Sequence, residues 1–553
     1  MGPEFKKAQG WQLWKENLGP EKNFYFLVFI YSSATSLLSL AIPISVQILV
    51  NTVTFAVLMQ PLIIVSVRLL GLLVFSGVLM GLQDYATEYL QRHLYARNTT
   101  NIAMKILNAS PASLKVLYSS DLVNRYFDIM TMQKKLAKLC VGGFSLVLQT
   151  IAGMLLLAFY HPYFLAFDII LTILLSLVWV FYGKSAMETA IKESKAKYKM
   201  GSWLEQLAQM NNLFKTTRGK EAAIKATDDN VNNYLNYRSQ HFSFLFRQII
   251  FLLAIYAFLS ALILGLGGFL VMEGQLTLGQ LVAAEIVVAV ILSGFAKAGS
   301  YLEAFYDLHA ALDKIADFDI LTSEEEKGIT GFDYKEVDLK FDNVSYRRQG
   351  FIYKFDQNFQ QDKNYLIKED FDSTQRIFLS FLQGAIKPER GHITLGSYDT
   401  TQISPLALRE AISVIDEPYL FEGTIRENLS FGSGDISDAD INEALDKVDL
   451  TTIIDKLPNK IDTRVWPGTQ LLCWGEMARL EIAKAFLQKP AWIVISSLFH
   501  QLPASFRSDI VKMMKDSDVG LIVWTSGHTE GDISQFCEEV NVSRELIITE
   551  EQR

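Results

Sequence analysis

The sequence predicts a helical membrane domain of six spans followed by a soluble α/β domain, and three observations carry this prediction. Of the 553 residues, 50% are apolar, and the long apolar runs all lie within about the first 310 residues. Two long connections between these runs are rich in Lys and Arg. From about residue 337 onward, short apolar strand patterns alternate with helical patterns, which is typical of an α/β fold.

Six apolar runs are each about long enough to cross a hydrocarbon core, which takes ~20 residues in a helix. Core helices of soluble proteins rarely come so long or so many in one chain. We therefore expect spans at 24–50, 61–82, 140–160, 162–183, 249–271 and 278–295. Residues 8–22 place Trp beside Lys and Glu, which predicts a short interfacial helix before the first span.

The positive charges predict how the spans are oriented. The short connections near 51–60, 160–163 and 271–278 contain no Lys or Arg, whereas the two long connections contain many. Because cytoplasmic loops carry an excess of these residues, we expect both long connections and both termini on the cytoplasmic side of a bacterial inner membrane. No cleavable signal peptide is visible.

Net charge and cysteine content say little about partners. The net charge is −9, and the acids lie mainly in the soluble part. We expect the lipid bilayer as a partner and no nucleic acid. Cys140, Cys473 and Cys537 lie far apart without metal-ligand spacing, so we expect neither a metal site nor a disulfide framework.

The long connections are expected to be helices rather than loops. Residues 83–107 and 184–210 have helical apolar spacing, few Gly or Pro and dense charge pairs. Each would continue a span beyond the membrane and lead to a turn, at 118–128 in the first hairpin and at 215–224 in the second. At 1.5 Å per residue these turns would lie ~25 Å or more below the bilayer.

This arrangement resembles a half-size exporter of the ATP-binding-cassette (ABC) family, most closely the type I secretion and multidrug-like exporters. The stretch "SSDLVNRYFDI" is similar to the family's first coupling segment, and "RGKEAAI" is similar to the second. The stretch "ILTSEEEKG" resembles the acidic linker after the sixth span. The resemblance places the coupling turns at Asp121, Arg125, Arg218 and Glu221.

The resemblance covers nearly the whole chain and implies four parts. These are an elbow helix (1–22), a transmembrane domain with two cytoplasmic hairpins (23–312), a linker (313–336) and a nucleotide-binding-like domain (337–553). In the last part, "LKFDNVSYRR" resembles the family's first strand, "LFEGTIRENL" the Q-loop segment and "ARLEIAKAFLQKP" the signature helix. The order of these phrases predicts the family's ATPase-like α/β fold.

Residues 369–376 stand in the place of the family's phosphate-binding loop but lack its chemistry. Such a loop reads G-x-x-x-x-G-K-[ST] and cradles phosphates with backbone N–H groups. By the resemblance, Gln375 stands for the Lys and Arg376 for the magnesium-binding Ser or Thr, while Glu369, Asp372 and Thr374 replace glycines. A carboxylate ~5 Å from a phosphate charge would repel it by about 1 kcal/mol even in water-like surroundings.

By the resemblance, the remaining functional positions of the ATP site also carry residues that differ from the family's. They are Arg348 for the adenine-stacking aromatic, Asp416 for the Q-loop glutamine, Cys473, Trp474, Gly475 and Glu476 for the signature, Ser496 and Ser497 for the Walker B pair, and Ser526 for the switch histidine.

Several of these changes remove a specific interaction. Trp474 replaces a glycine that must admit the γ-phosphate held by the opposite subunit, and Glu476 adds a negative charge there. Serine hydroxyls are neither useful bases at neutral pH nor strong Mg²⁺ ligands. We therefore expect that ATP and Mg²⁺ do not bind and that the protein is not an ATPase.

Three classes of function stay open. In the first, a homodimer docks other components of an export machine, such as a periplasmic adaptor, as a structural or accessory subunit. In the second, another energy source drives transport. In the third, an active partner subunit supplies ATP hydrolysis, although a composite site needs one subunit's phosphate loop and the other's signature, and both are altered here.

Ionisable residues inside the predicted spans are the candidates for the second class, because such residues are costly and usually functional. They are Arg68, Asp168 and Glu285. Asp168 lies not far from the outer face, where we expect a hydrated position. Glu285 is expected deeper in the membrane, as a candidate for binding protons or substrate.

Overall fold

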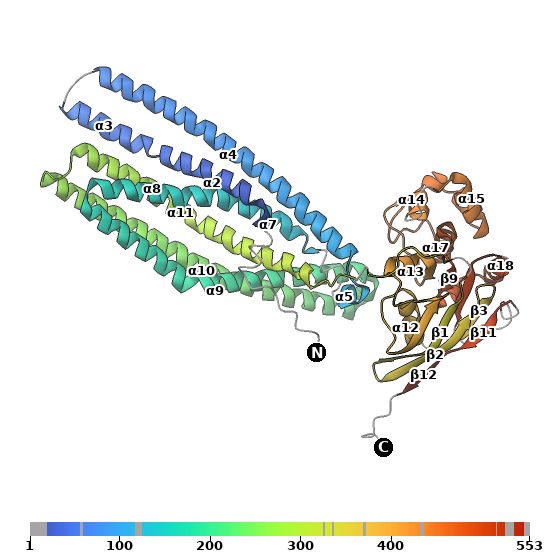
Figure 1. The fold of residues 1–553 in the computed structure, drawn as a ribbon. Helices are drawn as coiled ribbons and strands as arrows, with labels where there is room; N and C mark the ends of the chain where they lie inside the picture. Colours follow the sequence, from blue (N-terminus) through green and yellow to red (C-terminus); the bar gives the residue numbers. More distant parts are fainter. Residues whose placement is uncertain are drawn as a thin grey trace. The chain divides into compact units, whose positions relative to one another are not determined.

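The computed structural model of the chain describes residues 19–55, 59–116, 124–324, 327–334, 337–368, 372–431, 436–515, 517–525, 533 and 536–546. The chain forms two compact units that divide between Ser323 and Glu324. The first unit is helical and the second is α/β (Figure 1).

The first unit consists of long helices that run side by side along much of their length (Figure 1). Its described elements are η1 (Gly19–Glu21), α2 (Lys22–Leu38), α3 (Ala41–Phe55), α4 (Met59–Leu107), α5 (Pro111–Val116), α7 (Phe127–Lys138), the π-helical turn η2 (Leu139–Gly143), α8 (Phe144–Tyr160), α9 (Pro162–Gln209), η3 (Asn211–Phe214), α10 (Thr217–Met272), α11 (Leu278–Ile315) and η4 (Ala316–Ile320).

Five helical stretches are long and apolar enough to cross a membrane, and they coincide with the first five predicted spans. They are Gly19–Val53, Leu62–Leu107, Phe127–Tyr160, Pro162–Gln209 and Thr217–Met272. The sixth predicted span, 278–295, falls in α11, where the described apolar stretch is shorter and covers Leu278–Ile291. Many large apolar side chains along these helices are exposed in the single chain. Because such a surface needs an apolar surrounding, the chain is a multi-pass membrane protein.

Three helices continue far beyond the length that a bilayer needs. Helix α10 has 56 residues, which at 1.5 Å per residue makes it about 84 Å long, against a hydrocarbon core of about 30 Å. Helices α4 and α9 have 49 and 48 residues. The predicted helical extensions at 83–107 and 184–210 are therefore confirmed as unbroken parts of α4 and α9.

The second unit has two five-stranded sheets and a two-stranded sheet. The antiparallel sheet has the order β12-β2-β1-β4-β5, with β12 (Ser543–Leu546), β2 (Phe351–Phe359), β1 (Leu339–Arg348), β4 (Arg390–Leu395) and β5 (Tyr398–Asp399). The parallel sheet has the order β11-β3-β10-β9-β6, with β11 (Glu538–Asn541), β3 (Asn364–Lys368), β10 (Gly520–Thr525), β9 (Trp492–Ile495) and β6 (Ile412–Ile415). The two-stranded sheet pairs β7 (Gly423–Thr424) with β8 (Arg464–Val465) in antiparallel orientation.

Helices complete the second unit (Figure 1). They are α12 (Asp372–Leu382), α13 (Pro405–Ala411), α14 (Ile425–Ser430), α15 (Asp438–Lys447), α16 (Thr451–Ile454), α17 (Trp474–Gln488) and α18 (Ala504–Lys515), with the 3-10 turns η5 (Lys460–Asp462) and η6 (Ser497–Gln501). Strand β1 coincides with the predicted first strand, and α17 contains the predicted signature helix.

Helix α12 is anchored by aromatic packing against both sheets. The ring of Phe378 stacks on Phe341 of β1, with centroids 4.9 Å apart, and it lies 5.3 Å from Trp524 of β10. Strands β9 and β10 are buried at every residue, as expected for central parallel strands covered on both faces. This packing fixes the first turn of α12 beside the carboxyl ends of the parallel strands.

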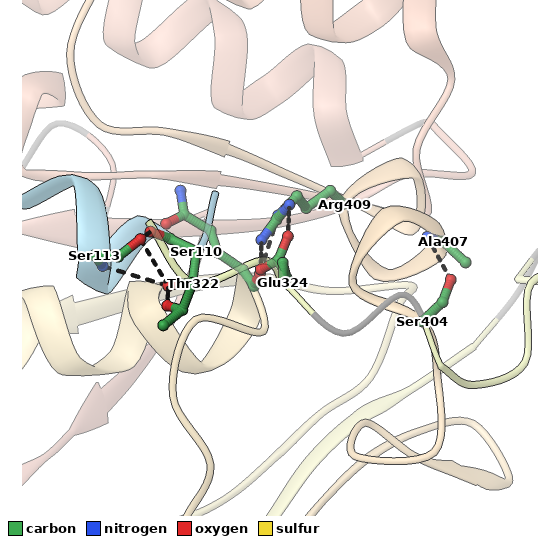
Figure 2. Close-up of polar contacts among 8 residues, drawn as sticks. Ser110, Ser113, Thr322, Glu324, Ser404, Ala407 and Arg409 are labelled. Atoms are coloured by element: carbon green, nitrogen blue, oxygen red, sulfur yellow. Dashed lines mark hydrogen bonds and ion pairs between the residues drawn. The ribbon is translucent and has the colours of Figure 1, made fainter. Parts of the chain in front are cut away.

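Residues just before and just after the division between the units form hydrogen bonds, each within its own unit (Figure 2). Within the first unit, the backbone N–H of Ser110 donates to the carbonyl of Thr322 (2.8 Å), and their hydroxyls lie 2.9 Å apart. Within the second unit, the guanidinium of Arg409 forms two bonds to the carboxylate of Glu324, at 2.8 and 2.6 Å. Of the predicted linker, Thr322 is therefore held by the first unit and Glu324 by the second.

Candidate functional site

The parallel sheet brings most of the predicted ATP-site positions to one edge. Strands β3, β6, β9 and β10 are all parallel, so their carboxyl ends meet at the same edge, where ligands of such sheets bind. Asp416 directly follows β6, Ser496 directly follows β9, and α12 comes after β3. The structure thus brings the phosphate-loop, Q-loop and Walker B positions together, as the resemblance implies.

The side chain of Gln375, at the phosphate-loop position, connects the Q-loop and Walker B positions. Its Oε1 accepts a hydrogen bond from the backbone N–H of Ser497 (3.3 Å), and its Nε2 donates to Oδ1 of Asp416 (3.5 Å). Gln375 is 3% exposed. The position that holds the phosphate-binding Lys in the family therefore carries a neutral, buried amide that is already engaged by protein groups.

Ser496 completes this network. Its hydroxyl donates to the backbone carbonyl of Asp416 (3.0 Å), and its backbone N–H donates to the carbonyl of Ile415 (2.9 Å). Ser496 is 1% exposed, so its buried hydroxyl is satisfied from within the protein, as stable interiors require. The hydroxyl takes part in holding the Q-loop backbone.

The rest of the altered loop is only partly described. Glu369 lies outside the described residues, and Asp372 is the first residue of α12. Thr374 is fully buried, and its Oγ1 has no hydrogen-bond partner in the part of the chain that the structure describes. Arg376, in the same helical turn, is exposed, whereas Thr374 and Gln375 are buried.

One cation near this turn was missed by sequence reasoning. Arg544, on the edge strand β12, donates from Nη1 to the hydroxyl of Ser373 (3.1 Å) and lies 4.6 Å from the ring centroid of Phe351. The pairing of β12 with β2 brings Arg544 close. No local pattern could have indicated this contact, because about 170 residues separate Arg544 from Ser373.

The altered signature caps its own helix. Cys473 is the N-cap residue of α17, and its backbone N–H donates to Oε2 of Glu476 (2.6 Å). A carboxylate at this position satisfies one of the unpaired N–H groups at the helix start and interacts favourably with the helix dipole. Trp474 packs half-buried against the core beside α17, and Gly475 follows it in the first helical turn. The carboxylate thus occupies the helix start where a partner's γ-phosphate would bind in the family.

The position expected to hold an adenine-stacking aromatic residue also differs from the family's pattern. Arg348 is exposed at the end of β1, where it pairs with Phe351. Tyr346, a possible substitute from the sequence, packs edge-on against Phe381, with ring centroids 5.7 Å apart. That ring therefore already packs against the protein's own core. The switch position Ser526 lies outside the described residues.

The residues present do not fit a magnesium nucleotide. No Lys takes part in the network, Asp416 adds a negative charge, and the Walker B positions offer hydroxyls in place of carboxylates. Among the described residues, no group of three or more His, Cys, Asp and Glu side chains gathers to hold a metal ion.

The coupling turns differ from each other in their surroundings. Arg125 is largely buried and forms an ion pair with Asp317 of η4, with Nη1 and Oδ2 2.6 Å apart. Arg218 and Glu221 are exposed in the first turn of α10, which Thr216 caps by accepting a bond from the N–H of Gly219 (3.0 Å). Asp121 lies outside the described residues.

For one of the intramembrane candidates, Asp168, the structure differs from the expectation. Asp168 is 4% exposed, and neither carboxylate oxygen has a partner among the described residues, so the expected hydrated position is wrong. Glu285 is half-buried with Oε2 unpartnered in the same sense. With α9 starting at Pro162 and α11 at Leu278, Asp168 and Glu285 lie about 9 and 10 Å from their helix starts, so a clearly deeper position of Glu285 stays a prediction. Arg68 is exposed on α4.

Comparison with known proteins agrees with this architecture. The family model of the ABC transporter transmembrane region matches residues 25–294, and the model of the ABC transporter domain matches 377–495. The second match begins directly after Arg376 and ends directly before Ser496.

Relatives and solved structures point the same way. An export ATP-binding/permease protein of Rickettsia bellii is 23% identical over 449 residues, 76% of this chain and 75% of the relative. The pediocin PA-1 transport/processing ATP-binding protein PedD of Pediococcus acidilactici is 22% identical over 520 residues, 90% of this chain and 71% of the relative. The structure of a bacterial Atm1-family ABC exporter with ATP bound superposes with a TM-score of 0.79 at 16% identity, covering 97% of this chain and 95% of that one.

The matched regions follow each other in the order that the fold shows, a helical membrane unit and then an α/β unit. This chain belongs to the ABC exporter family, with a transmembrane domain followed by an ATPase-like domain.

Proposed function

We propose that this protein is an exporter-fold membrane dimer that neither binds nor hydrolyses ATP and that acts as a structural or accessory component of an export assembly. Gln375 carries the proposal, because its amide links the Q-loop and Walker B positions in place of a phosphate-binding Lys. A nucleotide would have to break these partly buried contacts, and it would gain no cation from this residue in return.

The packing of the second unit supports a structural role. Large side chains of its core remain fully buried, among them Trp492, Trp524 and Phe378. Random decay would erode packing and chemistry together, since single core truncations cost about 2–5 kcal/mol. In this chain the altered positions instead bond to one another or cap a helix, which favours selection for a folded domain without catalysis.

The third class of function, an ATP-driven pair with an active subunit, has weaker support. A composite site takes its phosphate loop from one subunit and its signature from the other. Here Gln375 is engaged internally and Glu476 occupies the start of α17, so both composite sites of a heterodimer would be incomplete. ABC exporters typically act as dimers in the membrane, and we propose a homodimer for this chain.

The site of action follows from the same reasoning. We propose a bacterial inner membrane, with both termini and both helical hairpins on the cytoplasmic side, as the basic connections predict. Names of relatives refer to export and to transport and processing. A periplasmic adaptor is the partner class that an accessory subunit of an export assembly would dock.

ATP turnover by the purified full-length protein in lipid nanodiscs tests the loss of catalysis. We expect phosphate release at the level of a protein-free control, with and without Mg²⁺, while an active ABC exporter prepared alongside turns over. A Mg²⁺-dependent rate that saturates with ATP would contradict the proposal. Affinity capture of the tagged protein from its own membranes, with recovery of a periplasmic component, tests the accessory role.

A second candidate, transport driven by protons, is favoured by the burial of Asp168 without a partner among the described residues. An unpaired acid in the membrane is costly unless it is protonated or serves a function. In this case Asp168→Asn and Glu285→Gln would abolish transport while leaving assembly intact. Normal transport by both variants in proteoliposomes with an imposed pH gradient would exclude it.

A further inference from the structure

A cavity of about 360 Å³ lies within the first unit, between helices α2, α4, α8 and α11 and the π-helical turn η2. Small-molecule sites typically measure ~300–1,000 Å³, so this cavity is large enough for a small ligand. None of the three intramembrane candidates from the sequence, Arg68, Asp168 and Glu285, lines it.

The cavity has a polar wall within an apolar set of helices. Hydroxyl groups from α2 and α8 line one part, and some of them are fixed by hydrogen bonds. The hydroxyl of Ser36 donates to the carbonyl of Ser145 (3.3 Å). Gln83, which is nearly fully buried, donates from Nε2 to the hydroxyl of Ser32 (2.8 Å). Because buried polar groups are expensive in a membrane, so many of them around one space indicate a polar occupant.

Two opposite charges line the same cavity. Asp84 lies on α4 and Lys297 on α11, each directly after a predicted apolar run, 61–82 in one case and 278–295 in the other. Both residues are exposed in the single chain, and neither side chain forms an ion pair or hydrogen bond with another described residue. A single charge at such a boundary is ordinarily explained by its reaching water. A cation and an anion on different helices, unpaired and facing one cavity, suit a ligand that bears both charges.

The backbone around the cavity is shaped for close packing. A Cβ on Gly142, in the π-helical turn, would lie 2.3 Å from the hydroxyl of Tyr301. A Cβ on Gly294 would lie 2.0 Å from Cδ1 of Leu146. All four residues line the cavity. Single π-helical turns occur frequently at functional sites, and here the turn admits Tyr301 beside the polar wall.

We infer that this cavity binds a small zwitterion, with Asp84 holding its ammonium group and Lys297 holding its carboxylate or phosphate. The hydroxyl and carboxamide groups would bond the ligand's remaining polar atoms. The site lies wholly in the first unit, so it does not depend on the loss of ATP binding. Such a ligand could be a soluble amino-acid-like molecule or the headgroup of a zwitterionic lipid, and both present the same pair of charges.

Equilibrium binding to the full-length protein in detergent tests this site with three soluble probes. Glycylglycine represents the soluble zwitterion, glycerophosphoethanolamine the lipid headgroup, and N-acetylglycinamide an uncharged analogue. We expect one or both zwitterions to bind and the uncharged analogue not to bind. Binding of glycylglycine alone identifies a soluble source, and binding of glycerophosphoethanolamine alone identifies a lipid source.

Three variants make the test specific. Asp84→Asn and Lys297→Gln should each weaken zwitterion binding about ten-fold or more, since each removes one charge-assisted contact. Glu88→Gln is the matched control, because Glu88 lies one turn further along α4, pairs with Arg92 and does not line the cavity. It should bind like the original protein.

A double variant with Asp84→Lys and Lys297→Asp distinguishes a loss of ligand contacts from a loss of folding. It keeps the net charge and should recover part of the binding that either single variant loses, with unchanged elution in size exclusion. Failure of both zwitterions to bind the original protein would overturn the inference. Equal binding by the original protein, Asp84→Asn and Lys297→Gln would overturn it as well.

Discussion

The side-chain oxygen of Gln375 accepts a hydrogen bond from the backbone N–H of Ser497 at 3.3 Å. By the resemblance described above, these two residues stand where the ABC family has its phosphate-binding Lys and its catalytic Glu. Through this contact and its bond to Asp416, the side chain of Gln375 binds other protein groups at the position where a ligand would bind in the family.

Replacing Gln375 should destabilise the second unit. In Gln375→Ala the N–H of half-buried Ser497 and the exposed carboxylate of Asp416 each lose a hydrogen-bond partner, which costs about 0.5–1.5 kcal/mol per hydrogen bond. Thermal unfolding of the full-length protein measures this loss. Lys387→Ala is the control, because Lys387 is exposed and surface changes usually stay within about 0.5 kcal/mol. Equal stability of the two variants would show that the network is not structural.

Glu476 should behave as a helix cap. Glu476→Ala removes the acceptor for the N–H of Cys473 and should lower stability by about 0.5–2 kcal/mol, the usual range for a lost cap. Glu476→Gln keeps a capping oxygen and should lose much less. Comparison of the two unfolding midpoints checks this. Equal losses would mean that the negative charge, and not the hydrogen bond, is what matters at this position.

The ion pair of Arg125 with Asp317 should hold the first coupling turn to the end of α11. Both side chains are largely buried, 14% and 7% exposed, so Arg125→Ala leaves a buried carboxylate with one partner fewer and should cost about 3 kcal/mol. Arg218→Ala, at the exposed second turn, should cost almost nothing. Limited proteolysis would report the difference as faster cleavage near residue 124 in the first variant alone. Similar cleavage of both variants would contradict this role.

Glu481 gives the second unit a pH dependence. Burial raises the pKa of this carboxyl above its ordinary value, against the smaller opposing effects of Lys484 and the backbone of Tyr419. Because the folded pKa is raised, ionised Glu481 disfavours folding at neutral pH, and stability rises as the pH falls through the folded pKa. Glu481→Gln should therefore raise the unfolding midpoint at pH 7.5 and reduce the gain on acidification. An unchanged pH profile would rule out this effect.

The sequence predicted the parts of the fold that depend on local pattern. Apolar runs located the spans, and helical spacing located the extensions of α4 and α9, because both signals are read over 20 to 50 neighbouring residues. The order of family phrases located β1 and α17. The capping role of Glu476 was also within reach, since its spacing from Cys473 is that of a capping box.

Other features depend on tertiary contacts and could not be predicted. The burial of Asp168 depends on which face of α9 meets its neighbours, and the sequence position alone does not give this. The near-equal distances of Asp168 and Glu285 from their helix starts follow from where α9 and α11 begin. The contact of Gln375 with Ser497 joins residues 122 positions apart and depends on the parallel arrangement of β3, β10 and β9.

Isothermal titration of the full-length protein with ATP and Mg²⁺ tests the central claim most directly, because it measures binding whether or not hydrolysis follows. An active ABC exporter in the same detergent confirms that the conditions permit binding. The absence of saturable heat from this protein up to about 1 mM ATP, which corresponds to a binding free energy weaker than about −4 kcal/mol, is the predicted result. A saturable, Mg²⁺-dependent isotherm below that concentration would contradict the account.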